Sequence, residues 1–359
     1  MIEHKQGNLL EADAEALVNT VNCVGAMGKG IALQFKLAFP ENFKEYAKAC
    51  RHEEVKLGCM FTVPTGELYP RYIINFPTKD HWRGSSRIED IRAGLVALVE
   101  EIKRLEISSV AIPPLGCGNG GLRWSEVRPL IEEAMAAMPD VHVLLFAPQA
   151  APEADKMVVA TKKPNMSRSR ALLIQLMEFY RAPGYRLMML EVQKLAYFLQ
   201  ASGLDMKLDY SRNRFGPYSE KLNYVLQPME GHFIRGYGDR DKQSPGINLL
   251  SGATEAAHKQ LADDTEAQEH LERVAQLVES FETPYSMELL ASVHYVVQEN
   301  PAIANDVNAV ITVVRSWTQR KEKLFTPEHI KVAWQHLHDK GWLTAVTQPA
   351  TTQVHESVA

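Results

Sequence analysis

The sequence predicts a three-layer α/β architecture with a mixed, largely parallel sheet in its first part, followed by a mostly α-helical second domain. Two observations support this division. Short runs rich in apolar and β-branched residues alternate with helical patterns over the first 150 residues, whereas the later periodic segments almost all have helical spacing. A chain of 359 residues is long enough for two domains of ordinary size.

Strands and helices alternate along the first part of the chain. We expect strands at residues 16–22, 72–76, 109–115 and 141–147, and helices at residues 31–39, 40–51, 88–105 and 124–135. The short runs 110–112 and 143–146 are continuously apolar, which is typical of strands buried on both faces. Such an alternation indicates a largely parallel sheet covered by helices on both sides, and we assign it to residues 1–155.

The pattern stops near residue 150, and residues 156–167 lack periodicity and are interpreted as a linker. A second domain is expected over residues 168–345 and a flexible polar tail over residues 346–359. Amphipathic patterns predict helices at residues 170–181, 188–199, 270–281, 287–299, 305–320 and 327–340. A small β-hairpin is expected within residues 206–237, where glycine, proline and aromatic residues gather.

Composition excludes several classes of protein. No stretch approaches the ~20 apolar residues that span a bilayer, and the first residues do not resemble a signal peptide, so we expect a cytoplasmic protein. The four cysteines are scattered without a C-x-x-C pair, which disfavours a disulfide scaffold, and we expect no metal site and no cofactor. The net charge of −5 argues against generic electrostatic affinity for nucleic acid.

The charge is unevenly distributed. Residues 1–155 hold 16 Lys/Arg and 21 Asp/Glu, whereas residues 156–359 hold 23 of each, so the whole excess of acid lies in the first part. Within the second part, residues 255–282 contain eight acidic residues and two basic ones. The commoner interpretation of such an acidic stretch is the solvated face of helices.

Two glycine-rich loops are the strongest chemical signal. The segment VGAMGKG (24–30) follows one predicted strand, and LGCGNGG (115–121) follows another; each precedes a predicted helix. Backbone N–H groups in such turns bind anions, and ligands of open α/β sheets lie at the carboxyl ends of strands. Neither loop matches a P-loop or a dinucleotide-binding fingerprint. Two such loops therefore predict a ligand with two phosphates, although each glycine could alone serve a tight turn.

Polar side chains follow the same strands. Asn19 and Asn22 could hydrogen-bond a ribose hydroxyl, but their spacing alone favours an Asx turn or a helix cap. Pro77 is expected to end its strand, so that the segment from Thr78 onward projects from the tip. There Lys79 could pair with phosphate, act as an acid or base, or attack a sugar carbon as an amine, and by default it is a solvated charge.

At this point the residues resemble a known family. GNLLEADAEALVNTVNCVG, MGKGIALQFK and PPLGCGNGGLRW, in this order, resemble the macrodomain signature over about 150 residues. More narrowly, MGKGIALQFK together with NFPTKDHWR is similar to the macrodomains of the DarG family, the antitoxins of DarT–DarG toxin–antitoxin systems. The resemblance implies an ADP-ribose-binding enzyme, a DNA ADP-ribosyl glycohydrolase. It would remove the ADP-ribose that the DarT toxin attaches to thymidine in single-stranded DNA, which is a form of DNA repair.

The resemblance also implies individual roles. Lys79 corresponds to the lysine that this subfamily needs for hydrolysis, and a run of glycines followed by Asp, typical of protein-hydrolysing macrodomains, is absent from the first loop. Many macrodomains have Asp where this chain has Asn8, beside the adenine contact. The predicted ADP-ribose-binding residues are Asn8, Leu9, Asn19, Thr20, Asn22, Gly28, Lys29, Gly30, Ile31, Ala32, Leu33, Thr78, Gly116, Cys117, Gly118, Asn119, Gly120 and Gly121.

The second part resembles the Panacea-type antitoxin domain. The similarity rests on LEVQKLAYFLQ and on the downstream RNRFGPYSEKL. It implies that this part binds and blocks the DarT toxin, an ADP-ribosyltransferase that holds single-stranded DNA. The acidic stretch at residues 255–282 could then mimic DNA phosphates in the toxin's groove. The expected partners are thus the toxin, ADP-ribosylated single-stranded DNA and ADP-ribose as product.

Two mechanisms are open for the predicted hydrolysis. Lys79 could attack C1″ of the ribose, or its opened aldehyde form, and give a Schiff base, or it could stay protonated and stabilise the departing thymine. The rival functions are a reader that binds ADP-ribose without turnover, a protein ADP-ribose hydrolase with a separate interaction domain, and an antitoxin that only binds its toxin.

Overall fold

The computed structural model describes residues 1–149, 158–180, 185, 187–237 and 246–343. The chain divides into two compact units, one formed by residues 1–164 with 230–245 and the other by residues 165–229 with 246–359. Each is described by itself. The predicted tail at residues 346–359 lies outside the described residues. Among the residues that the structure describes, no helix is long and apolar enough to cross a membrane.

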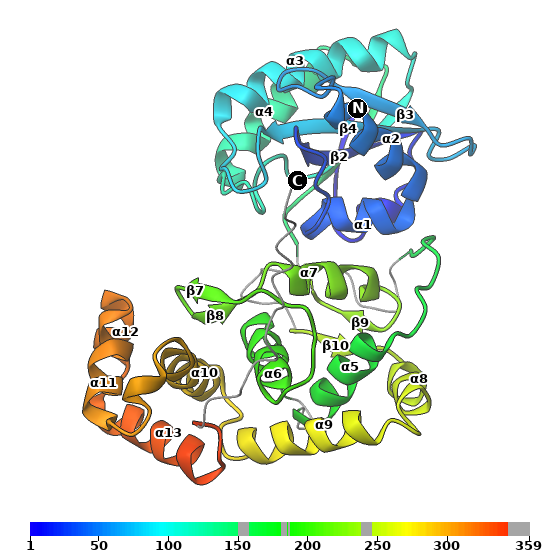
Figure 1. Ribbon diagram of the computed structural model, residues 1–359. Coiled ribbons are helices and arrows are strands. Elements are labelled where there is room, and N and C mark those ends of the chain that lie inside the picture. The colour runs from blue at the N-terminus through cyan, green and yellow to red at the C-terminus, as the bar shows by residue number, and fades with distance from the viewer. Residues whose placement is uncertain (150–157, 181–184, 186, 238–245, 344–359) are drawn as a thin grey trace, which may run out of the picture. The chain divides into compact units, whose positions relative to one another are not determined.

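The first unit is a six-stranded sheet between two layers of helices (Figure 1). The strand order is β1-β6-β5-β2-β4-β3, and every pair is parallel except β3 with β4. The strands are β1 (Ile2–Lys5), β2 (Ala16–Asn22), β3 (Phe61–Pro64), β4 (Tyr72–Lys79), β5 (Ser109–Ile112) and β6 (His142–Phe146). The helices are η1 (Leu9–Glu11), α1 (Gly30–Ala38), α2 (Pro40–Arg51), α3 (Ile88–Arg104) and α4 (Trp124–Ala136), and β9 (Ile234–Arg235) belongs to the same unit. The mixed, largely parallel sheet predicted from the sequence is confirmed.

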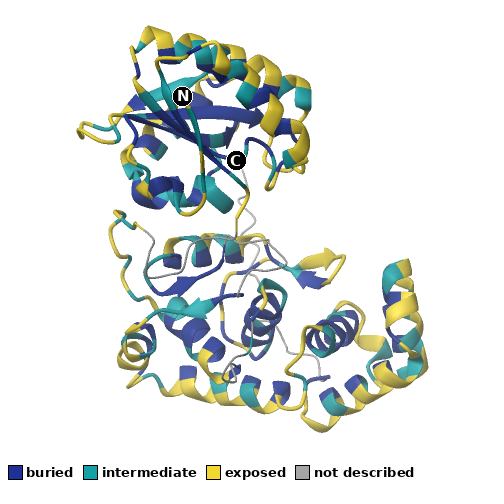
Figure 2. Cartoon of the chain, turned by 180° about the vertical axis from the view of Figure 1, so that it is seen from behind, coloured by how far each residue is buried: buried dark blue, intermediate teal, exposed yellow. Residues whose placement is uncertain are grey.

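Side-chain alternation along each strand builds a core on both faces of the sheet. In β2, Ala16 and Val18 join the cluster with α3 and α4, whereas Leu17 faces α1. Both layers are needed because the central strands are apolar on both faces, and Figure 2 shows them buried between helices whose outer sides are exposed. α3 approaches β4 closely, since a Cβ on Gly94 would lie 2.2 Å from Cζ of Phe76.

Some predicted elements differ from the structure at their ends. The strand expected at residues 72–76 continues through Pro77 to Lys79 as β4. Pro77 lies beyond Asn75, the last β4 residue in register with β3, so its missing N–H removes no bond from that pairing. The sequence also did not reveal β1 and β3, which are short and weakly patterned.

The second unit is mostly helical. Its elements are α5 (Arg168–Tyr180), α6 (Met189–Ala201), β7 (Ser211–Asn213), β8 (Gly216–Tyr218), α7 (Lys221–Leu226), η3 (Gln227–Met229), β10 (Asn248–Leu249), α8 (Ala253–Gln260), α9 (Thr265–Val278), α10 (Pro284–Glu299), η4 (Pro301–Ile303), α11 (Val307–Ser316), α12 (Gln319–Leu324) and α13 (Pro327–Asp339). The buried helix α10 packs against α6, α11 and α13. The hairpin expected within residues 206–237 is β7 with β8, and the helix expected at residues 305–320 is broken into α11 and α12.

Candidate functional site

The two glycine loops lie at the same edge of the sheet. The first loop (residues 23–29) leaves the carboxyl end of β2, and the second loop (residues 115–121) follows β5, the parallel neighbour of β2. A Cβ built on Gly30, where α1 begins, would lie 3.0 Å from Nδ2 of Asn119 in the second loop. The structure therefore brings the two predicted phosphate-binding segments together, although they are about ninety residues apart in the sequence.

Asn22 shapes the first loop. Its Oδ1 accepts from the backbone N–H of Val24 at 3.0 Å and of Ala26 at 3.3 Å, and its Nδ2 donates to the Ala26 carbonyl at 2.6 Å. The hydroxyl of Tyr46 donates to the Asn22 carbonyl at 2.6 Å. The turn leads directly into α1, whose first N–H groups have no partner within the helix and face the end of the loop. Asn22 thus forms the Asx turn that its spacing favours, and its contact with a ribose remains a prediction.

Glycine is required in the second loop because the backbone folds on itself. Gly116 has φ +69°, and its carbonyl accepts from Leu122 N at 3.0 Å. A Cβ on Gly120 would lie 2.4 Å from that same carbonyl oxygen. Ser86, which precedes α3, donates its N–H to the Gly120 carbonyl at 2.9 Å. Its hydroxyl is buried under the loop and has no hydrogen-bond partner among the described residues.

Cys117 lies in the second loop but is a poor nucleophile. Its side chain is partly buried, and its Sγ contacts the Leu115 carbonyl at 3.4 Å. Burial raises the pKa of Cys117 to about 11, so the group stays a thiol at neutral pH. Burial, with the charge of Asp80, likewise raises the pKa of Cys23 to about 11. Neither thiol rivals Lys79 as the reactive group of this edge.

Lys79 is the last residue of β4 and lies beside both loops. The register between β2 and β4 shifts at this point, with Val21 opposite Pro77 and Asn22 opposite Lys79. Thr78 is therefore the extra residue of a β-bulge, a feature that commonly re-aims a side chain next to an active site. Its buried hydroxyl donates to the Val21 carbonyl at 3.3 Å.

The Lys79 amine donates to backbone carbonyls from two separate segments. Nζ lies 2.9 Å from the Asn119 carbonyl, 3.2 Å from that of Gly84 and 3.4 Å from that of Trp82. Three carbonyl acceptors match the three N–H bonds of an ammonium, whereas a neutral amine has one donor fewer. Lys79 thus joins the segment 80–86 to the second glycine loop.

Several predicted residues lie inside the protein. Asn19 is fully buried, and its Nδ2 donates to Oδ1 of Asn75 at 3.0 Å, while Asn75 Nδ2 donates to Oδ1 of Asn42 at 2.7 Å. Leu9 packs in the core on the α1 side of the sheet. Both side chains are buried in this conformation, and their contacts with ADP-ribose remain predictions. Asn8 caps η1 through the Leu10 N–H at 3.1 Å.

Sequence reasoning missed Asn42, Asn75 and Ser86. For Asn75 the available signal was a polar residue inside an apolar run, because YIINF carries an asparagine, as VNTVN does at Asn19. Asn19 and Asn75 are directly opposite in the β2–β4 register, but that register follows from the three-dimensional pairing and not from the spacing.

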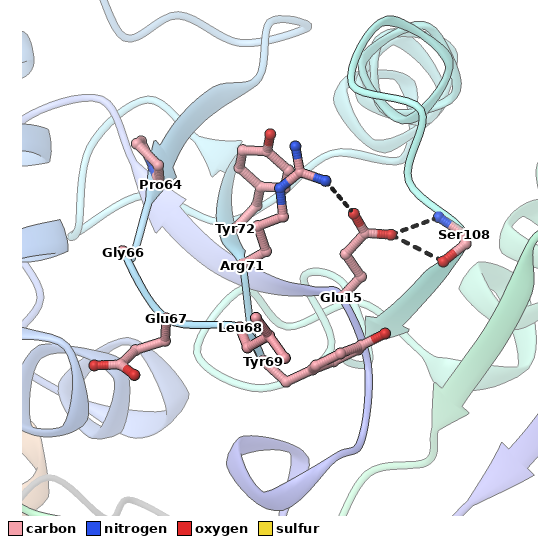
Figure 3. A pocket seen from close by; sticks show the side chains of 9 residues that line it. All are labelled: Glu15, Pro64, Gly66, Glu67, Leu68, Tyr69, Arg71, Tyr72 and Ser108. Carbon is pink, nitrogen blue, oxygen red and sulfur yellow. Dashed lines mark hydrogen bonds and ion pairs between the residues drawn. The ribbon is translucent and has the colours of Figure 1, made fainter.

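A different hollow lies at the opposite edge of the sheet (Figure 3). It forms around Glu15, which precedes β2, and the loop between β3 and β4. The Glu15 carboxylate accepts from Arg71 at 2.9 Å and from the N–H and hydroxyl of Ser108 at 2.8 and 2.9 Å. These bonds connect the amino ends of β2, β4 and β5, which lie away from both glycine loops. We therefore assign this hollow no part in the site.

The two motifs of the second unit meet in space. Lys194 in α6 is buried, and its Nζ donates to the Pro217 carbonyl in β8 at 2.6 Å. Gln193 exchanges two hydrogen bonds with the backbone of Ser219, at 3.0 and 3.1 Å. Burial, with the charge of Lys321, lowers the pKa of Lys194 to about 7. The similar segments LEVQKLAYFLQ and RNRFGPYSEKL are thus one structural unit.

Comparison with known proteins gives the class of this fold and site. A sequence model of the Macro domain matches residues 18–131, which include most of β2, all of β5 and both glycine loops. The first unit is therefore a macrodomain.

The full chain gives the family. It is 48% identical to a DNA ADP-ribosyl glycohydrolase of Thermus aquaticus over 96% of this chain and 94% of that protein. It therefore belongs to the DNA ADP-ribosyl glycohydrolase family, the DarG family, whose members are hydrolases. The solved macrodomain of Mycobacterium tuberculosis DarG is 55% identical and covers 42% of this chain and 99% of its own, with a TM-score of 0.41. A Thermosipho africanus protein is named a DNA ADP-ribosyl transferase-DNA ADP-ribosyl glycohydrolase fusion protein. It is 33% identical over 40% of this chain and 41% of its own length.

Proposed function

We propose that the first unit hydrolyses the N-glycosidic bond between ADP-ribose and thymidine in single-stranded DNA, and that the reaction depends on Lys79. The hydrogen bond from Lys79 Nζ to the Asn119 carbonyl, 2.9 Å long, carries this proposal. This bond connects Lys79, which the sequence singled out as a reactive cation, with a loop that is suited to binding a diphosphate. The printed names of the full-length relatives, DNA ADP-ribosyl glycohydrolase, support the choice of substrate.

Binding would use the backbone of the two loops. The amino end of α1 and the second loop present N–H groups at one sheet edge, and the closeness of Gly30 and Asn119 puts both loops within reach of one diphosphate. Lys79 would then lie next to the sugar that follows the diphosphate. The buried amides of Asn19, Asn42 and Asn75 would support the floor of this site.

Lys79 would act as an ammonium. Water adds to C1″, the bond from C1″ to thymine N3 breaks, and its electron pair leaves on the imide as a delocalised anion. The proton released by the water finally restores N3–H, so ADP-ribose and unmodified thymidine are the products. The Lys79 ammonium stabilises the departing imide anion through its charge, and it keeps its hydrogen bonds to the three backbone carbonyls while doing so. A Schiff-base route would require the amine to lose its proton first.

Lys79→Ala tests the proposal on an oligonucleotide that carries one ADP-ribosylated thymidine. We expect release of ADP-ribose to fall by about 10²–10³-fold, the usual loss when one charge-stabilising donor is removed. The affinity for free ADP-ribose should change much less. Lys44→Ala is the matched control, because Lys44 pairs with Glu41 on the exposed face of α2 at 3.3 Å. Full activity of Lys79→Ala would remove the lysine from the mechanism.

Two further measurements separate the alternatives. Borohydride added during turnover should trap no ADP-ribose adduct on Lys79; a trapped adduct would establish the Schiff-base route instead. A wild-type protein that binds ADP-ribose but releases none from modified DNA would be a reader. Release from ADP-ribosylated protein and not from DNA would identify a protein ADP-ribose hydrolase.

We also propose that the second unit binds and blocks a DarT-type transferase. The name of the Thermosipho africanus relative, which joins a transferase to a glycohydrolase, supports such a pairing. In the acidic stretch, Asp264 and Glu266 are engaged by Arg168 at 2.6 and 2.7 Å, whereas Glu269 and Glu272 are exposed on α9. On this helix the exposed pair is therefore better placed to mimic phosphates than the two carboxylates that Arg168 already neutralises.

The full chain with Glu269→Lys and Glu272→Lys tests the phosphate mimic. We expect weaker capture of an inactivated toxin, with unchanged hydrolysis of ADP-ribosylated DNA. Reversal of Glu100, an exposed residue of α3 in the first unit, is the control. Unchanged capture by the double variant would show that α9 is an ordinary solvated face.

A further inference from the structure

An exposed group of aromatic and cationic side chains follows Lys79 directly. Trp82 keeps 45% of its surface exposed, although both of its neighbours in the sequence contact its ring. The Arg83 guanidinium lies 4.5 Å from the indole centroid, and the His81 ring centroid lies 5.3 Å from it. A large apolar ring next to a cation, open to solvent, is the usual composition of a surface that stacks nucleic-acid bases.

The backbone holds this group at a fixed distance from Lys79. The Trp82 carbonyl accepts from Lys79 Nζ at 3.4 Å, and the Asp80 carbonyl accepts from the N–H of Cys23 at 2.9 Å. The His81 carbonyl accepts from the N–H of Gly84 at 2.9 Å, which closes the turn. The indole therefore does not lie on an unconstrained loop, because the peptide groups around it are bonded to the lysine and to the end of β2.

The charge around Trp82 differs from that of the whole domain. Residues 79–83 carry Lys79 and Arg83 against Asp80, whereas residues 1–155 have five more acidic than basic residues. A DNA strand would therefore be attracted to this segment more than to the unit as a whole. Local positive charge and an exposed indole thus coincide beside the proposed catalytic lysine.

We infer that Trp82 and Arg83 form a stacking platform for a nucleobase that flanks the modified thymidine in single-stranded DNA. This inference rests on the proposed function and adds the way in which the strand is held. ADP-ribose is bound by the glycine loops, and the flanking base stacks on the indole while the guanidinium faces the ring or a phosphate. The platform makes the site selective for a DNA strand over isolated ADP-ribosyl-thymidine.

The test compares two substrates, ADP-ribosyl-thymidine and a short single-stranded oligonucleotide that carries the same modification. Trp82→Ala retains the carbonyl that Lys79 contacts, and removes only the ring. We expect its KM for the oligonucleotide to rise about tenfold or more, which corresponds to one lost base stack. Its kcat/KM for ADP-ribosyl-thymidine and its Kd for ADP-ribose should stay within about twofold of wild type. Trp82→Phe should recover part of the oligonucleotide affinity.

Arg83 and a remote aromatic residue complete the design. Arg83→Gln should lower the salt dependence of oligonucleotide binding by about 0.7 in the log–log slope, the value for one phosphate contact of a single strand. Tyr69→Ala is the matched control, because Tyr69 is 55% exposed and lies at the opposite edge of the sheet (Figure 3). It should affect neither substrate.

The outcomes are distinct. Equal losses on both substrates would overturn the platform and assign Trp82 a role in holding the loop. No loss on either substrate would also overturn it, and a protein partner would then be the candidate ligand of the exposed ring. If the wild type cleaves neither substrate, the proposed hydrolysis fails, but the ratio of the two binding constants still reports on the platform. A ratio that Trp82→Ala leaves unchanged would refute the platform in that case too.

Discussion

Replacing Gly30 by alanine tests whether the two glycine loops act on one ligand. Gly30 has φ +59°, a conformation that costs an L side chain about 1–2 kcal/mol. The new Cβ would lie 3.0 Å from Nδ2 of Asn119, an exposed amide that can rotate away, so the loss of stability should not exceed this backbone cost by much. The methyl group would still occupy the space where a phosphate approaches the first N–H groups of α1. We expect ADP-ribose to bind about tenfold or more weakly.

Gly66→Ala is the matched control for this substitution. Gly66 has φ +81°, a Cβ added there would meet no atom within 4 Å, and the residue belongs to the loop at the opposite edge of the sheet (Figure 3). Both variants carry similar backbone strain, and only one places a methyl group between the loops. Thermal unfolding gives the stability of each variant, and calorimetric titration with ADP-ribose gives its Kd. Wild-type affinity in Gly30→Ala would refute the idea that the loops share a ligand.

Three further predictions concern buried polar groups. Asn75→Ala removes the amide partner of Asn42 and leaves the buried Asn19 Nδ2 only its 3.8 Å contact with Met27 Sδ, and we expect the free energy of unfolding of the first unit to fall by about 2–3 kcal/mol in urea titrations. Glu288→Ala should lower the free energy of unfolding of the second unit by about 3–5 kcal/mol, because it leaves the buried Lys321, 2.7 Å from that carboxylate, without its partner. Glu288→Met combined with Lys321→Met should recover most of this loss in a double-mutant cycle. Additive losses would refute the coupling. The pKa of Lys194 is lowered from 10.5 to about 7, so between these two pH values the unfolded chain binds more protons than the folded one. The stability of the wild type relative to Lys194→Met should therefore rise with pH from about 7 to 10.5. A difference in urea midpoint that stays constant over this range would refute the prediction.

The sequence predicted the layers of the first unit because its central strands are strongly apolar and its helices strongly periodic. The strand at residues 16–22 and the helix at residues 40–51 agree with β2 and α2 at both ends. β3 was missed because it has only four residues and its burial does not alternate, so it gives little signal. The loops could be located because each follows an apolar strand, but their approach through Gly30 and Asn119 depends on β2 and β5 being neighbours.

The second unit was predicted as a series of helices, and its internal organisation was not. The pattern at residues 305–320 reads as one helix, but Thr318 caps a new helix by accepting from the Lys321 N–H, which separates α11 from α12. This break lets Lys321 reach Glu288 in α10. Pairwise charge contacts between distant helices leave no periodic trace in a sequence, so neither this ion pair nor the Lys194 contact with β8 could be foreseen.

The position of Lys79 shows how one extra residue can create a site. Alternation along β4 directs Ile74 and Phe76 toward α3 and α4, so a regular strand would direct Thr78 to that face and Lys79 to the opposite one. The bulge at Thr78 shifts the register, and Lys79 instead lies opposite Asn22, on the face from which the second glycine loop and the segment 80–86 arise. Only there can Nζ reach the carbonyls of both segments. Lys79, the second glycine loop and the exposed indole of Trp82 are therefore brought together by a register shift that no residue spacing in the sequence reveals.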